Sequence, residues 1–330
     1  MMKFIDNQNI TDPTLNLALE EYAVSQLDPN ETYLLFYVNE PSIIIGKNQN
    51  TVEEVNQAYV KENNIHVVRR LSGGGAVYHD LGNLNFSFIT TDDGHSFHNF
   101  KKFTEPVVKA LQGMGIDAKL SGRNDIQVGP KKISGNAQYK TKGRMFSHGT
   151  LLLDSNLEDV VKALNVKEDK IVSKGIKSIR SRVANINEFL DTPLSMKQFK
   201  KELLRFIFQG EENISYYEFT EEDKKAVHDI AEKRYRNWDW NYGHSPKFNM
   251  KHAHRFPIGK IEIQLQIERG YIKNAKIYGD FFGVKNVEEI EKALRKIRYT
   301  EEDVRAVFET FTLSDYFGTV TIEEIITMMF

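Results

Sequence analysis

The stretch RRLSGGGAVYHD, residues 69–80, is the most informative part of the chain. Two arginines precede three successive glycines, and apolar residues follow them. Glycine lets the backbone pass where side chains would clash, and successive free N–H groups in such a loop can bind an anion. The arginines add fixed positive charge beside the loop. We therefore interpret this stretch as a site for a nucleotide phosphate.

This glycine loop matches neither of two familiar phosphate-binding sequences. It lacks the Gly-Lys-Ser/Thr ending of a Walker A loop and the G-x-G-x-x-G spacing of the dinucleotide fingerprint. A triple glycine by itself is equally compatible with a tight turn between two strands. The flanking arginines favour the anion site, because two adjacent arginines at a strand end are costly to hold near a core without an anionic partner.

Composition limits the function classes that need to be considered. The chain has 330 residues, of which 40% are hydrophobic and 27% charged, as in ordinary globular proteins. A net charge of -2 gives no basic balance for nucleic acid, and no segment has the length of a membrane span or the apolar core of a signal peptide. The absence of cysteine excludes disulfides and thiolate nucleophiles. We expect a soluble cytoplasmic protein without nucleic-acid or membrane partners.

Apolar patterns on both sides of the glycine loop predict a mixed sheet with helices. A helical face spans residues 15–22, and strands are predicted at 33–38, 42–45, 65–68 and 84–90. Further strands are predicted at 125–128, 132–133 and 150–153, and helices at 100–111, 157–164 and 196–208. Pro106 would either kink its helix or mark its true first turn.

The segment WDWNYGHSP, residues 238–246, indicates a domain boundary. It is rich in turn formers and contains both tryptophans, which suggests a segment packed onto a domain. Beyond it, residues 261–268 alternate strictly between apolar and polar, as in a half-buried antiparallel strand, and residues 271–278 form its partner. Two amphipathic helices follow. We expect one domain at residues 1–246 and a small α+β domain at residues 247–330.

A second group of candidate residues lies downstream of the loop. Lys132 leads into a small-residue turn, and lysine is a compact point charge suited to a phosphate or a developing oxyanion. A plain surface lysine is the alternative. The pairs His95-x-x-His98 and His252-x-His254 lack further ligands nearby in sequence, so we reject zinc.

Together these motifs resemble the lipoate–protein ligases. The matching segments are NLALEE (16–21), IGKNQN (45–50), the stretch 69–80 with Gly82-Asn83, GRND (122–125), KISG (132–135), HGTLL (148–152), GIKSIRSRV (175–183) and WDWNYG (238–243). They stand in the family's order and span nearly the full chain, most weakly after residue 250. Motifs this numerous make the resemblance highly specific.

The resemblance implies a fold shared with biotin ligases and class II aminoacyl-tRNA synthetases. This is an α+β fold with a mixed, largely antiparallel sheet flanked by helices, followed by a small α+β C-terminal accessory domain. It implies an ATP-dependent ligase that converts lipoate into lipoyl-AMP. The lipoyl group then passes to a lysine of an acceptor, either a lipoyl domain of a 2-oxoacid dehydrogenase E2 subunit or the glycine-cleavage H protein. ATP and Mg²⁺ are the expected cofactors.

The resemblance also implies roles for particular residues. Lys132 matches the catalytic lysine that contacts both lipoate and nucleotide. The remaining ATP contacts would be Arg70, Gly75, Ala76, Val77 and Tyr78, and the remaining lipoate contacts Leu71, Ser72, Gly74, His79 and Tyr37. Ser178, Arg180 and Arg182 match the segment that covers the adenylate, unless their side chains only face solvent. Asp125 is a candidate Mg²⁺ ligand, although such an Asp more often caps a turn, and His79 is equally compatible with a structural role.

Three alternatives remain to be weighed against this interpretation. Acyl transferases of the same fold pass the acyl group through a cysteine thioester, which a chain without cysteine cannot form. The arginine-rich Gly-Arg-Gly loop of biotin ligases is absent. A non-catalytic module that binds lipoate or a carrier protein is the third, and the intact Arg70, triple glycine and Lys132 argue against it.

Overall fold

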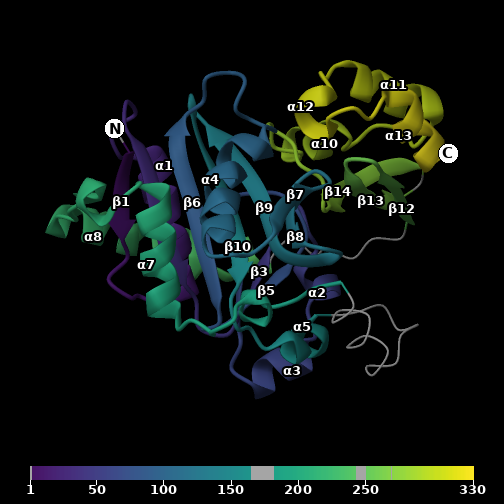
Figure 1. The fold of residues 1–330 in the computed structure, drawn as a ribbon. Helices are drawn as coiled ribbons and strands as arrows, with labels where there is room; N and C mark the ends of the chain where they lie inside the picture. The colour runs from purple at the N-terminus through teal and green to yellow at the C-terminus, as the bar shows by residue number, and fades with distance from the viewer. Residues whose placement is uncertain (1, 165–181, 243–249, 269) are drawn as a thin grey trace. The chain divides into compact units, whose positions relative to one another are not determined.

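The computed structural model describes residues 2–164, 182–242, 250–268 and 270–330 (Figure 1). The chain divides into two compact units. The first unit comprises Met1–Ile44, Val55–Val68 and Val77–Asn237, and the second comprises Ile45–Glu54, Arg69–Ala76 and Trp238–Phe330. Two loops from the N-terminal half therefore belong to the second unit. The boundary expected at residue 246 lies outside the described residues and stays a prediction.

An eight-stranded sheet forms the centre of the first unit, in the order β11-β1-β2-β6-β10-β9-β8-β7. Its strands are β1 (Met2–Asp6), β2 (Thr32–Val38), β6 (Asn83–Thr91), β7 (Ala118–Ser121), β8 (Asp125–Val128), β9 (Lys131–Thr141), β10 (Arg144–Leu152) and β11 (Ser215–Tyr217). Strand β1 pairs in parallel with β2 and β11, whereas the other neighbours are antiparallel. The predicted mixed, largely antiparallel sheet is confirmed.

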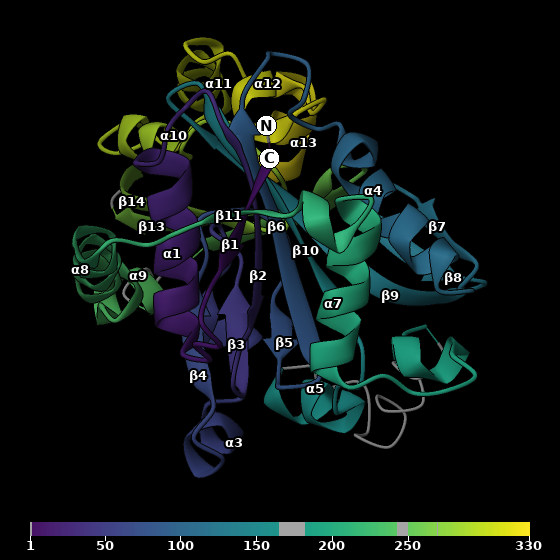
Figure 2. The same ribbon diagram turned by 60° about the vertical axis from the view of Figure 1, so that its left-hand side comes forward.

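One face of this sheet carries the hydrophobic core of the first unit. Alternate residues of the central strands, such as Phe36, Phe86 and Met145, pack against α4 (Phe100–Gly113) and α7 (Met196–Ile207). Figure 2 shows these two helices on one side of the sheet and α1 (Pro13–Ser25) on the other. The suggestion that Pro106 marks the first turn of α4 is wrong, because Asn99 caps the helix and Pro106 lies inside it.

A second sheet has three strands in the order β4-β3-β5. They are β4 (His66–Arg69), β3 (Ser42–Ile45) and β5 (Val77–His79). The glycine loop runs from the end of β4 to the start of β5. The remaining short elements are α2 (Thr51–Glu54), α3 (Gln57–Glu62), α5 (Leu157–Ala163), η1 (Ile186–Phe189), η2 (Glu211–Asn213), α8 (Glu221–Ile230), η3 (Ala231–Tyr235) and α9 (Trp238–Asn241).

The C-terminal part of the second unit is an antiparallel sheet covered by helices. Its strands are β12 (Met250–Phe256), β13 (Gly259–Glu268) and β14 (Tyr271–Gly279), and its helices are α10 (Glu288–Ala293), α11 (Glu301–Glu309), α12 (Ser314–Phe317) and α13 (Ile322–Met329). Ile261, Ile263 and Leu265 are buried in its core, as the alternation predicted. The strand is not half-buried, however, because Glu262 and Gln264 on its other face are also buried.

The buried carboxylate of Glu262 is explained by its neighbours. Lys251 lies 2.7 Å away on the adjacent strand, and Lys260 and the amide of Gln264 also bind the carboxylate. Such pairing compensates for lost hydration. No helix among the described residues is long and apolar enough to cross a membrane.

Candidate active site

The face of the central sheet that lies toward α1 carries polar side chains where the opposite face carries the core. Directly paired residues of neighbouring strands project to the same face. Tyr37 on β2 pairs with Asn85 on β6, which pairs with Thr150 on β10. In the adjacent row, Ser87 pairs with His148. These rows run across the strands at the middle of the sheet.

The first row ends at Lys132. The backbone N–H of Gly135 on β9 donates to Thr150 Oγ1 at 3.2 Å, which places Gly135 next in the row. A Cβ atom at Gly135 would lie 3.0 Å from Lys132 Nζ, so the ammonium lies over this glycine on the same face. Three strand spacings separate Gly135 from Tyr37, or about 14 Å. The face therefore presents a cation at one end and a buried aromatic side chain at the other.

The ammonium of Lys132 has one carboxylate partner, Asp125 on β8, whose Oδ1 lies 2.8 Å away. Both side chains are about one-third exposed, so solvent screens their attraction. The Lys132 backbone is held on its other side, where its N–H donates to Arg182 O and its carbonyl accepts from Ala184 N–H. Hydrogen bonds thus hold the Lys132 backbone in place, while its ammonium remains accessible to solvent.

Two buried polar atoms on the same face have no hydrogen-bond partner among the described residues. They are Asn83 Oδ1 and Ser87 Oγ, both on β6 and both in residues that are fully buried. Buried polar atoms are nearly always hydrogen-bonded, and exceptions concentrate where a ligand or water binds. A water molecule or a polar group of a ligand on this face would satisfy them.

A buried carboxylate from α1 also reaches this face. The two carboxylate oxygens of Glu20 lie 2.9 and 3.0 Å from Nδ1 of His148, and both side chains are buried. Glu20 and His148 lie in motifs that resemble the family, but the sequence assigns a role to neither. Their pairing depends on the packing of α1 on β10, which sequence spacing does not reveal.

The side chain of Arg70 forms hydrogen bonds with residues of the glycine loop. Its Nε donates to Ser72 Oγ at 3.0 Å, and its Nη2 donates to the carbonyls of Gly73 and Gly75 at 2.7 and 2.8 Å. Gly74 has φ +91°, which favours glycine, and a Cβ at Gly73 would lie 2.5 Å from the carbonyl oxygen of Phe281. A Cβ at Gly75 would meet nothing within 4 Å. The start of the loop therefore has no room for a side chain, whereas the space beside Gly75 is open.

The neighbouring Arg69 has a different environment. It is only 2% exposed, and its guanidinium donates to the carbonyls of Gly46, Lys47 and Gln49 at 2.7–3.0 Å. It also donates to Trp240 O at 2.9 Å and to the hydroxyl of Thr51 at 2.6 Å. All of these acceptors are neutral. The expectation that both arginines need an anionic partner is therefore wrong for Arg69.

Burial lowers the pKa of Arg69 to about 10, which still leaves the guanidinium charged at neutral pH.

The backbone of Arg69 is also bound by the segment around Trp240. Trp240 Nε1 donates to Arg69 O, and Arg69 N–H donates to Asn241 Oδ1. Arg69 therefore joins the 46–51 loop, the base of the glycine loop and the segment around Trp240 within the second unit.

The predicted site residues fall in both units. Arg70, Leu71, Ser72 and Gly74 are buried in the second unit, which also contains the exposed Gly75 and the half-buried Ala76. Tyr37, His79 and Tyr78 are buried in the first unit, which also contains Val77, Asp125 and Lys132. Burial raises the pKa of Tyr78, so its hydroxyl stays protonated. Arg182 is exposed, whereas Ser178 and Arg180 lie outside the described residues.

No described residues form a group of three or more His, Cys, Asp or Glu side chains that could hold a metal ion. Asp125 supplies one carboxylate, already bonded to Lys132. Mg²⁺ commonly takes most of its ligands from phosphates and water, so it does not require such a group.

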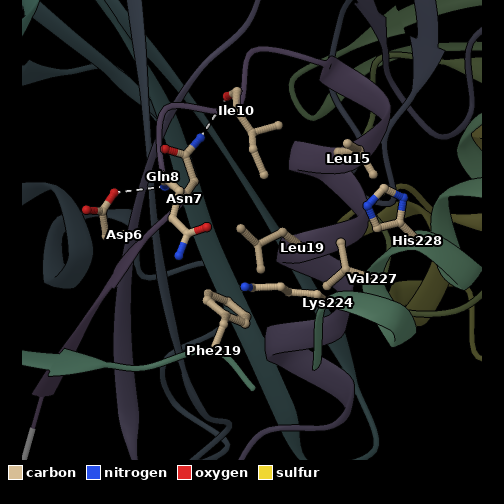
Figure 3. Close-up of a pocket in the computed structure, with 10 residues that line it drawn as sticks. All are labelled: Asp6, Asn7, Gln8, Ile10, Leu15, Leu19, Phe219, Lys224, Val227 and His228. Atoms are coloured by element: carbon tan, nitrogen blue, oxygen red, sulfur yellow. Dashed lines mark hydrogen bonds between the residues drawn. The ribbon is translucent and has the colours of Figure 1, made fainter. Parts of the chain in front are cut away.

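The pocket in Figure 3 lies elsewhere in the first unit. Its cavity volume is about 120 Å³. It is lined by Asp6, Asn7, Gln8, Ile10, Leu15, Leu19, Phe219, Lys224, Val227 and His228. None of these is a predicted site residue, so this pocket does not contribute to the candidate site.

Comparisons with known proteins show which family this chain belongs to. The sequence models of the Lipoyl protein ligase A/B catalytic domain and of the Bacterial lipoate protein ligase C-terminus match residues 12–208 and 245–329. The lipoate-protein ligase LplJ of Bacillus subtilis is 60% identical, with 100% of both chains covered. This chain belongs to the lipoate–protein ligase family. Lipoate–protein ligase 1 of Staphylococcus aureus is 56% identical, covering 99% of this chain and 100% of the relative.

Solved lipoate–protein ligases share the fold. LipL1 of P. falciparum, in complex with lipoate, has a TM-score of 0.80 at 27% identity and covers 99% of this chain and 98% of its own. A lipoate-protein ligase A bound with ATP has a TM-score of 0.64 at 31% identity, covering 74% of this chain and 99% of its own. The fold class and enzyme class expected from the sequence are confirmed.

The Arg69→Met variant tests the structural role of this arginine. Met fills similar space but leaves the carbonyls of Gly46, Lys47 and Gln49 without their donor. We expect a loss of stability of at least about 3 kcal/mol, because each buried acceptor left unsatisfied costs about 1–3 kcal/mol. Urea unfolding followed by tryptophan fluorescence is the measurement, since both tryptophans lie in the second unit.

The matched control is Arg255→Met, which removes an exposed arginine paired with Asp280 in the same unit. An exposed ion pair contributes about 0–1 kcal/mol, so this variant should unfold close to the unsubstituted protein. Equal unfolding midpoints for the two variants would contradict the role given to Arg69.

Proposed function

We propose that this ligase activates free lipoate with ATP and transfers the lipoyl group to a lysine of an acceptor protein. The observation that carries the proposal is the position of Lys132. Its ammonium ends a row of side chains on the polar sheet face, about 14 Å of strand spacings from Tyr37. A fatty acid with a ring at its far end needs this order: a cation for the carboxylate and an uncharged surface for the tail.

In the first step, a lipoate carboxylate oxygen attacks the α-phosphorus of ATP. The new O–P bond forms as the bond to the β-phosphate oxygen breaks, and pyrophosphate leaves. The attack brings two anions together, and the Lys132 ammonium lowers the cost of doing so. Asp125, 2.8 Å from Nζ, keeps the ammonium over Gly135 rather than extended into solvent.

In the second step, the neutral ε-amine of the acceptor lysine attacks the acyl carbon of lipoyl-AMP. The amide C–N bond forms, the C–O bond to AMP breaks, and the amine gives up a proton. Negative charge develops on the carbonyl oxygen, where the same Lys132 ammonium stabilises it. A thioester route is closed to this chain, because it has no cysteine.

The remaining contacts also stay proposals. Gly75 supports nucleotide binding by its open surroundings, and Ala76, Val77 and Tyr78 continue the loop. Arg70, which donates to the carbonyls of Gly73 and Gly75 in the glycine loop, is proposed to bind a phosphate of the nucleotide. The further lipoate contacts Leu71, Ser72, Gly74 and His79, and the covering residue Arg182, rest on the family pattern.

Mg²⁺ is proposed to accompany ATP. Asp125 is the candidate protein ligand beside Lys132, and Mg²⁺ commonly takes its other ligands from phosphates and water. When bound, it neutralises the leaving pyrophosphate. The expected cytoplasmic location stays a prediction.

Lys132→Ala should abolish detectable lipoate-dependent ATP–pyrophosphate exchange while leaving the fold intact. The loss of one such stabilising group costs about 2.7–4 kcal/mol in transition-state energy. Lys131→Ala is the control, because it removes the same charge from the adjacent position of the strand. It should retain activity. Near-normal exchange by Lys132→Ala would exclude the role given to Lys132.

The same assay separates an enzyme from a binding module. The unsubstituted ligase should exchange pyrophosphate only when lipoate is present. If it shows no exchange under any condition but still binds lipoate, the protein is a binding module and the proposed activity is wrong.

The acceptor is tested with purified H protein and purified E2 lipoyl domains, each incubated with ligase, ATP and lipoate. Intact-protein mass spectrometry should detect one lipoyl group on at least one of them. A Lys→Arg substitution at the acceptor lysine is the control and should remain unmodified. If neither acceptor gains mass while pyrophosphate exchange proceeds, the acceptor class is wrong and the activation step stands.

A further inference from the structure

A continuous chain of buried side-chain amides leads to His79. Asn7 Nδ2 donates to Asn16 Oδ1 at 2.9 Å, and Asn16 Nδ2 donates to Asn39 Oδ1 at 2.9 Å. The amide of Asn39 then lies 3.0 Å from Nδ1 of His79. All four side chains are at most 3% exposed. These residues come from four separate parts of the first unit: the end of β1, helix α1, the end of β2 and strand β5.

Backbone carbonyls fix the orientation of the first two amides. Asn7 Nδ2 donates to the carbonyl of Ile10 at 2.9 Å, as Figure 3 shows. Asn16 Nδ2 lies 2.9 Å from the same carbonyl and 3.2 Å from the carbonyl of Val38. A carbonyl can only accept, so the nitrogen of each amide must face it. The nitrogen of Asn16 therefore also faces Asn39.

This orientation determines the next two links. Two amide nitrogens 2.9 Å apart would repel each other because neither can accept a hydrogen bond, so the oxygen of Asn39 must face Asn16. The nitrogen of Asn39 then faces His79 Nδ1, and an amide nitrogen can only donate. Nδ1 must accept, which requires that it carries no proton. In a neutral imidazole the proton then resides on Nε2.

We infer that Asn39 is a positioning residue that holds His79 in the tautomer with its proton on Nε2, so that His79 donates a hydrogen bond to an oxygen of the substrate. The inference rests on the proposed placement of His79 at lipoate. The lone pair of Nδ1 is engaged by Asn39, so His79 cannot also accept the proton of the acceptor amine without losing that bond. His79 is a donor in this reaction, suited to the carboxylate of lipoate or the carbonyl oxygen of the adenylate.

The tautomer can be measured directly on the full-length protein without substrate. The protein has nine histidines, and its long-range ¹H–¹⁵N spectrum after ¹⁵N-histidine labelling separates protonated from unprotonated ring nitrogens. A His79→Gln spectrum identifies the signals of His79. At neutral pH, we expect an unprotonated Nδ1 and a protonated Nε2. A protonated Nδ1 in the unsubstituted protein would overturn the inference, whether or not any variant folds.

Asn39→Asp provides the second readout. The carboxylate is nearly isosteric with the amide but can only accept, so His79 should respond by protonating Nδ1. Asn99→Asp is the matched control, because Asn99 is an exposed helix cap whose oxygen accepts from Lys102 N–H, a bond that Asp retains. It adds the same charge and should leave the His79 signals unchanged. An unchanged His79 spectrum in Asn39→Asp would also overturn the inference.

The effect on catalysis is measured by lipoate-dependent pyrophosphate exchange. Asn39→Asp should lower kcat at least about tenfold, less than the roughly 10²–10³-fold that removal of an oxyanion-type donor costs. The KM for ATP should change little, whereas a general loss of structure would alter both. If the unsubstituted protein shows the expected tautomer but no exchange, the proposed function fails and the tautomer assignment stands.

Discussion

The buried guanidinium of Arg69 joins segments of the second unit, and its hydrogen-bond acceptors among the described residues are neutral. The guanidinium of Arg69 donates to carbonyls of the 46–49 loop, to Thr51 and to Trp240, and the backbone of the same residue is bound by Trp240 and Asn241. A planar group with five N–H donors can satisfy such a set, and an ammonium cannot. The base of the glycine loop is therefore fixed by the residue immediately before Arg70.

The two adjacent arginines have different hydrogen-bond partners in the second unit. Arg69 joins the base of the glycine loop to two other segments of the second unit, residues 46–51 and 240–241. The guanidinium of Arg70 donates to Ser72, Gly73 and Gly75 of its own loop, and its backbone N–H donates to the carbonyl of Ile45. The adjacent arginines have the same charge but different environments, and those environments decide which of them is proposed to meet a nucleotide.

The first unit supplies a polar sheet face opposite its hydrophobic core. Alternation within each strand creates both faces, with Phe86 in the core and Asn85 on the polar side of the same strand. The polar face carries buried groups that a core would not tolerate, including Ser87 and the Glu20–His148 pair. Lys132 lies at the end of this face.

The sequence predicted the elements that carry strong patterns. Strands β2, β3 and β13 follow continuous or alternating apolar runs. The site roles given to Lys132 and the glycine loop stay predictions. The burial of Glu262 was missed, because it depends on lysines that the alternating pattern does not place. The environment of Arg69 was also missed, since its acceptors come from segments distant in sequence, and the amide chain to His79 depends on packing between four such segments.

If Lys132 serves an acyl-adenylate, the protein itself never carries the acyl group. Rapid chemical quench of the ligase with ATP and labelled lipoate, without acceptor, distinguishes the two routes. We expect lipoyl-AMP in amounts approaching the enzyme concentration, and its disappearance in step with acceptor modification when H protein or a lipoyl domain is added. Modified acceptor without prior lipoyl-AMP, or label bound covalently to the ligase, would exclude the acyl-adenylate route.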